Sequence, residues 1–79
     1  GNWPQWQITI EGHSDEQGSS RYNLLVSERR AQAVKDALIA YGINASRIKV
    51  VGYGEERPVD PGHTKMAWAR NRRVEISIR

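Results

Sequence analysis

Three short segments with the residue pattern of β-strands constrain the fold of this chain more than any other feature. In the first and the third, apolar side chains alternate with polar ones, as in a strand with one buried face. The second is rich in β-branched residues, which favour strands, and it ends at a glycine. The three segments are residues 6–11, 47–52 and 74–79.

Two helices are predicted between these strands. Ser27 can cap a helix over residues 28–41, and Gly42 can end it in a left-handed conformation. Farther along, Thr64 can cap a short helix that ends near Arg70. At 100° per residue the longer helix has one apolar stripe, formed by Ala31, Val34, Ala37, Leu38 and Tyr41.

This order of elements predicts the fold class. A strand, a helix and a second strand form a right-handed crossover, so the first two strands are expected to be parallel. We expect the third strand to join the same sheet. The prediction is an α/β (α+β) fold: a two-layer sandwich, β-α-β-(α)-β, with a mixed sheet and helices on one face. The 79 residues suffice for one small domain, residues 1–79.

Composition and charge argue against several classes of function for this chain. Twelve basic and nine acidic residues give a net charge of +3, and the two signs are mixed along the chain. A nucleic-acid-binding domain usually concentrates its basic residues more strongly. No apolar run is long enough to span a membrane. Because the chain has no cysteine, disulfides and thiolate metal sites are excluded.

Arg30 is the most unusual residue of the predicted helix. Its neighbour Arg29 falls on the polar side, whereas Arg30 falls within the apolar stripe, in what we expect to be the first turn. Free backbone N–H groups there favour an anion. A guanidinium on a buried face needs a partner, which can be a nearby acid that holds the loop or the carboxylate of a ligand.

Asp15 is the acid that we expect beside Arg30. It lies in the loop that leaves the first strand, and in a parallel crossover that loop reaches the start of the following helix. Ligands of open α/β sheets bind at such carboxyl ends of strands. An aspartate and an arginine on one pocket rim suit a zwitterion with both an ammonium and a carboxylate group.

Several motifs then show a resemblance. The segments TIEGHSDEQGSSRYNLLVSERRAQAVKDAL, RIKVVGYGEERP and NRRVEI are similar to the OmpA C-terminal-like family, and within it to the peptidoglycan-associated lipoproteins of Gram-negative bacteria. The resemblance covers nearly all of the chain from Trp6 onward. It implies a periplasmic, outer-membrane-associated domain that binds peptidoglycan without a covalent bond and tethers the outer membrane to the cell wall.

The resemblance also implies a ligand and a site. The family recognises the meso-diaminopimelate residue of the stem peptide, and its ligand pair falls on Asp15 of GHSD and on Arg30 of SERRA. Asn23 is a candidate for the same rim, although it can equally hold the loop onto the helix. Asn71 belongs to the NRR motif, which the resemblance places near the pocket. Of the two arginines that follow Asn71, we expect one to pair with an acid.

We expect neither an enzyme nor a cofactor or metal. Ser14 lies next to His13, but no third group is assured to orient them as a catalytic set. Glu11 and His13 share one face of a strand, yet no second histidine lies near, and His63 is in another loop.

Two other functions remain open. A basic nucleic-acid module could use Arg70, Arg72, Arg73 and Arg79, although we expect no nucleic acid as a partner. Alternatively, the domain could chiefly contact proteins, such as the partners in the Tol system that the resemblance implies.

The start of the chain departs from the resemblance. Related domains begin with a further strand and helix before the position of Trp6, so we expect a domain that lacks its first strand and helix. Such a loss exposes a sheet edge together with Val74, Ile76 and Ile78. We therefore expect self-association through this edge.

Overall fold

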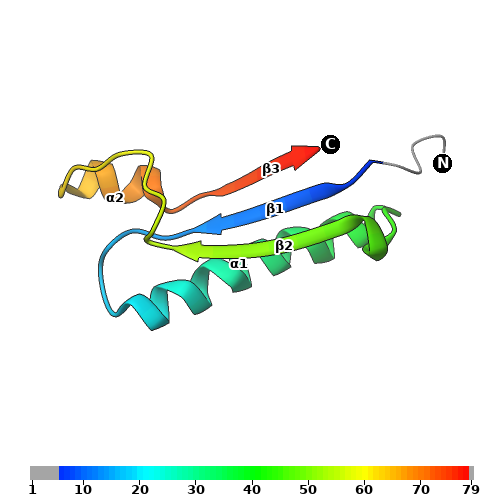
Figure 1. The fold of residues 1–79 in the computed structure, drawn as a ribbon, viewed down its shortest axis with the longest axis horizontal. Helices are drawn as coiled ribbons and strands as arrows, with labels where there is room; N and C mark the ends of the chain where they lie inside the picture. Colours follow the sequence, from blue (N-terminus) through cyan, green and yellow to red (C-terminus); the bar gives the residue numbers. More distant parts are fainter. Residues whose placement is uncertain (1–5, 79) are drawn as a thin grey trace.

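A computed structural model describes residues 6–78 and contains one mixed sheet and two α-helices. The sheet order is β2-β1-β3, in which β1 runs parallel to β2 and antiparallel to β3 (Figure 1). The predicted α+β class and the mixed sheet are therefore confirmed. The elements are β1 (Ile8–His13), α1 (Ser20–Ala40), a 3-10 turn (Ala45–Arg47), β2 (Ile48–Gly54), α2 (Lys65–Asn71) and β3 (Val74–Ile78).

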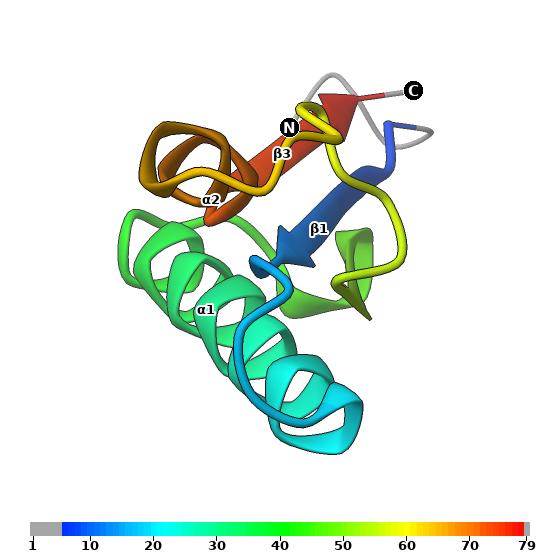
Figure 2. The same ribbon diagram turned by 90° about the vertical axis from the view of Figure 1, so that its left-hand side faces the viewer.

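The two layers are the sheet and α1. This helix packs mainly on β1 and β2, whereas α2 lies beyond the carboxyl ends of these strands (Figures 1 and 2). Ile10, Ala31 and Ile48 form the buried core. The core is small, and Ile76 and Ile78 of β3 remain 52% and 56% exposed because α1 barely reaches that strand.

Helix α1 begins eight residues earlier than predicted. Ser19 is its N-cap, and the Ser19 side chain accepts a hydrogen bond from the backbone N–H of Tyr22 (3.1 Å). The prediction that Ser27 caps the helix is wrong, because Ser27 is a buried residue within it. The Ser- and Gly-rich segment before Tyr22 has a loop-like composition, but it also supplies the cap.

The role of Ser27 is to join α1 to the sheet. Its hydroxyl donates to the carbonyl oxygen of Leu24 (2.7 Å) and accepts from the backbone N–H of Gly54 (2.9 Å). At Gly12, an added Cβ would collide with the carbonyl oxygen of Ser27. The glycine thus lets α1 approach the end of β1 closely.

The C-terminal end of α1 follows the prediction. Gly42 has a φ of 102°, and the N–H of Ile43 donates to the carbonyl oxygen of Leu38 (3.1 Å), as in a Schellman motif. Within the predicted stripe, however, Ala37 and Tyr41 are exposed. Tyr41 is the C-cap residue, so it lies past the last turn of the apolar face. Thr64 caps α2 as predicted and accepts from the N–H of Ala67 (3.1 Å).

Candidate functional site

A hollow of about 160 Å³ lies where the loop after β1 meets α1. Figure 2 shows this loop as it leaves the end of β1 and turns into the first turn of α1. Three of the four predicted site residues line the hollow, namely Asp15, Asn23 and Arg30. The other lining residues are Ser14, Gln17, Tyr22, Val26 and Arg72.

Asp15 is the carboxylate of the hollow, and only 7% of it is exposed. Its Oδ2 accepts from Nη1 of Arg72 at 2.7 Å, and its Oδ1 accepts from the backbone N–H of Gln17 at 2.9 Å. The structure thus gives Asp15 an ion-pair partner that sequence reasoning did not assign to it. We expected one of the two arginines after Asn71 to pair with an acid, but nothing in their spacing identified Asp15.

Arg30 approaches the hollow from the middle of α1. Its Nη1 donates to the carbonyl oxygen of His13 at 3.3 Å, which directs the guanidinium toward the end of β1. Because α1 begins at Ser20, Arg30 is three turns into the helix. The expectation that free N–H groups of a first turn assist Arg30 is therefore wrong.

Asn23 contributes an amide donor without a partner. The residue is 4% exposed, and its Nδ2 makes no hydrogen bond to any residue within 6–78. A buried donor that is left unpaired costs free energy, so native structures rarely keep one without a reason. An oxygen atom of a ligand in the hollow would satisfy this donor.

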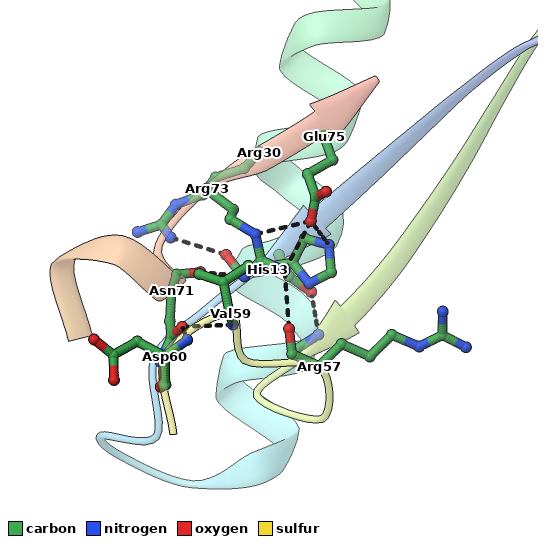
Figure 3. A network of polar contacts seen from close by, with 10 residues as sticks. His13, Arg30, Arg57, Val59, Asp60, Asn71, Arg73 and Glu75 are labelled. Carbon is green, nitrogen blue, oxygen red and sulfur yellow. Dashed lines mark hydrogen bonds and ion pairs between the residues drawn. The ribbon is translucent and has the colours of Figure 1, made fainter. Parts of the chain in front are cut away.

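Asn71 lies outside the lining of the hollow. Its Oδ1 accepts from the N–H groups of Val59 (2.9 Å) and Asp60 (3.0 Å), and its Nδ2 donates to the carbonyl oxygen of Asp60 (2.8 Å) (Figure 3). Both ends of the amide are therefore engaged by the backbone of one loop. This corrects the expectation that Asn71 lines the pocket. It instead fixes the backbone directly before Arg72.

A second contact holds the loop from its outer side. Oε1 of Glu16 accepts from Nε1 of Trp68 at 2.9 Å and lies 2.6 Å from Nδ1 of His63. The hydrogen bond from Trp68, followed by that with His63, lowers the pKa of Glu16. These contacts connect the loop after β1 to α2, and no sequence motif predicted them.

The charges of the hollow suit an anionic or zwitterionic ligand. Two guanidinium groups and one carboxylate line it, so one positive charge is in excess. The carboxylate of Asp15 retains lone pairs beyond its two hydrogen bonds and can accept from an ammonium group. Arg30 and Asn23 offer donors to a carboxylate.

Comparisons with known proteins agree with the motifs. The OmpA family model matches residues 3–72. A protein named peptidoglycan-associated lipoprotein, from Pseudomonas aeruginosa, is 46% identical over 70 residues, which are 89% of this chain and 42% of that protein. Outer membrane porin F of the same organism is 47% identical over 77 residues, 96% of this chain and 22% of the porin. This chain thus spans less than half of the length of either relative.

Solved structures share the fold. The crystal structure of the peptidoglycan-associated lipoprotein from Burkholderia pseudomallei superposes with a TM-score of 0.94 at 40% identity, over 99% of this chain and 66% of that one. The C-terminal domain of Helicobacter pylori MotB superposes with a TM-score of 0.88 at 26% identity, over 96% of this chain and 59% of that one. By sequence and by fold, this chain belongs to the OmpA family.

Proposed function

We propose that this domain binds peptidoglycan without a covalent bond and tethers the outer membrane to the cell wall from the periplasmic side. Relatives whose names state an association with peptidoglycan, and a relative named as an outer membrane porin, support this proposal. None of the helices within residues 6–78 combines the length and the apolar character that a bilayer crossing requires.

The ligand proposed for the hollow is the meso-diaminopimelate residue of a stem peptide. The free end of this residue carries a carboxylate beside an ammonium group. Arg30 and the Nδ2 of Asn23 would take the carboxylate, and Asp15 would accept from the ammonium. Arg72 holds Asp15 in place through the 2.7 Å contact. Asn71 acts indirectly, because it fixes the backbone that precedes Arg72.

The observation that carries this proposal is the unpaired amide donor of Asn23 in the same hollow as Asp15 and Arg30. Charged groups at a surface often pair only with each other. A donor that is almost fully buried and makes no hydrogen bond within residues 6–78 supports a site that a further acceptor completes.

We propose binding rather than catalysis. The hydroxyl of Ser14 donates to the carbonyl oxygen of Asp15 at 3.1 Å. The ring of His13 stacks on Tyr53 with centroids 5.5 Å apart. Neither arrangement activates the serine as a nucleophile, which would need a hydrogen bond to a general base.

An amide chemical-shift titration with a diaminopimelate-containing stem peptide tests the proposal. We expect shifts clustered at residues 14–23 and near Arg30. Asp15→Asn and Arg30→Ala should abolish them. Arg29→Ala is a matched control because Arg29 is the neighbouring arginine, is exposed and does not line this hollow. Equal shifts in Arg30→Ala and Arg29→Ala would reject the hollow as the binding site.

The nucleic-acid alternative is less well supported. Arg70, Arg72 and Arg73 each form an ion pair with an acid, at 3.0, 2.7 and 2.7 Å, so they do not form an uncompensated basic patch. Arg79 lies outside the described residues.

If the domain chiefly contacts proteins, such as those of the Tol system, the stem-peptide titration will leave the amide signals of residues 14–23 unshifted.

A further inference from the structure

The face of the sheet opposite α1 carries three side chains with metal-binding atoms, on two adjacent strands. Glu11 and His13 project from β1, and Glu75 of β3 is the direct antiparallel partner of Glu11. One ligand atom from each residue lies within 4.8 Å of the other two. We call these residues the Glu–His cluster. None of them lines the hollow described above.

His13 is the most unusual member of the cluster. It is 1% exposed, and neither of its ring nitrogens makes a hydrogen bond with any residue in the described part of the chain. Its Nε2 lies 3.3 Å from Oε2 of Glu75, which is close enough for an ion pair but does not have hydrogen-bond geometry. Stacking on Tyr53 fixes the plane of the ring. The imidazole of His13 is therefore buried and held in one orientation. Its Nε2 lies close to Glu75, and neither ring nitrogen has a hydrogen-bond partner among the described residues.

The charges of the cluster are only partly balanced. Like charges directly opposite each other on antiparallel strands are destabilising. Arg73 compensates Glu75, with contacts from Nε at 2.8 Å and from Nη2 at 2.7 Å (Figure 3). Within residues 6–78, no ion pair or hydrogen bond joins Arg73 to Glu11. Arg57 is a second positive charge that acts on His13, from its place over the ring of Tyr53. A cation is therefore favoured at the carboxylate of Glu11, which has no guanidinium partner in the described part of the chain.

The position of Arg73 does not block such a cation. Arg73 also donates to the carbonyl oxygens of Arg57 (2.9 Å) and Asn71 (3.4 Å), so it stays in place if Glu75 turns. The contacts of Glu75 with Arg73 and His13 all use Oε2. Oε1 of the same carboxylate can thus bind a cation while Oε2 retains its contacts with Arg73. The side chain of Glu75 is 52% exposed, which gives it room to turn.

We propose that Glu11, His13 and Glu75 form a zinc site on the open face of the sheet. Imidazole nitrogens and carboxylate oxygens are both Zn²⁺ ligands in proteins, and a site with three protein ligands leaves a fourth position for water. Mg²⁺ and Ca²⁺ prefer six or more oxygen ligands and gain little from an imidazole.

A Zn²⁺ titration followed by NMR of the histidine side chains tests the proposal. We expect the ring signals of His13 to shift and the melting temperature to rise with Zn²⁺, but not with Mg²⁺ at the same concentration. Glu11→Gln should weaken Zn²⁺ binding at least about tenfold, because losing a ligand costs no less than losing an outer-shell group. Glu75→Gln serves the same purpose if Glu11→Gln does not fold.

The control is the other histidine–glutamate pair of the molecule. His63 and Glu16 lie 2.6 Å apart on the surface and could bind zinc weakly. His63→Ala should leave Zn²⁺ binding unchanged. The proposal is overturned if His63→Ala removes the binding, if Glu11→Gln and Glu75→Gln both retain it, or if about 1 mM Zn²⁺ leaves the His13 signals unmoved.

Discussion

Asp15 and Arg72 form an ion pair of 2.7 Å across a sequence separation of 57 residues. This pair joins the loop after β1 to the residue that follows α2. It fixes the carboxylate of the proposed ligand pocket before any ligand arrives. A preorganised site loses less conformational entropy on binding than a mobile one.

Arg72→Ala should therefore lower both stability and affinity. The Asp15 side chain is 9% exposed, so removing its partner leaves a nearly buried carboxylate with one backbone donor. We expect a loss of about 1–3 kcal/mol in the free energy of unfolding. Urea denaturation measures it, with Arg70→Ala as the control. Arg70 pairs with Asp60 at the surface, where such pairs contribute about 1 kcal/mol or less. Equal losses in both variants would contradict a structural role for the Asp15–Arg72 pair.

Gly12→Ala should be among the most destabilising single substitutions. The new Cβ would meet the carbonyl carbon of Ser27 at 2.7 Å, and backbone cannot move aside as a flexible side chain can. Gly42→Ala is the comparison, because its Cβ meets nothing within 4 Å but its φ is 102°. That left-handed conformation costs alanine about 1–2 kcal/mol. Thermal unfolding should show a clearly larger loss for Gly12→Ala; the reverse order would contradict the close approach of α1.

Stability should fall as the pH drops below about 6.5, the ordinary pKa of histidine. Burial lowers the pKa of His13 in the folded state, and Arg73 lowers it further. Between the lowered value and 6.5 the unfolded chain binds more protons, so the free energy of unfolding rises with pH. The stabilising contribution is present above 6.5 and is lost as the pH falls through the folded pKa.

Urea midpoints between pH 5 and 7.5, measured with a metal chelator present, check this dependence. His13→Gln should flatten the profile in that range. A profile that His63→Gln flattens instead would assign the pH dependence to the surface pair.

The chain should self-associate through β3. Within the described residues, the outer edge of this strand has no partner, and Ile76 and Ile78 beside it are half exposed. An unpaired edge with exposed apolar side chains favours pairing with another chain. Light scattering should show a mass that rises with concentration. Ile76→Lys should suppress the rise, and Ile39→Lys on α1 should not. A monomeric mass at about 1 mM would contradict this expectation.

Local patterns in the sequence predicted most of the fold. Three strands, two helices, the Gly42 stop and the Thr64 cap all depend on short-range preferences, and all are present. The start of α1 was predicted wrongly because Ser19 and Ser27 are both good caps. Only the packing of Ser27 against Gly54, far away in sequence, distinguishes the two.

The contacts within the site were harder to predict, because they also depend on residues that are far apart in sequence. Helix periodicity indicated Arg30, the position of the loop after the first strand indicated Asp15, and the motif resemblance matched both. Both residues line one hollow. The partner of Asp15 depends on where the residue after α2 lies relative to the end of β1. The place of Glu75 opposite Glu11 depends on the antiparallel register of β3. Neither long-range relation leaves a signal in one sequence.

The most direct measurement of the central claim is a calorimetric comparison of two stem peptides that differ only in diaminopimelate or lysine at one position. Lysine lacks the second carboxylate, so the donors of Arg30 and Asn23 would lose their acceptor. A loss of about 1–3 kcal/mol corresponds to roughly 5- to 150-fold weaker binding. We expect the lysine peptide to bind more weakly by a factor in this range. Equal dissociation constants would contradict the claim that this hollow binds the diaminopimelate end.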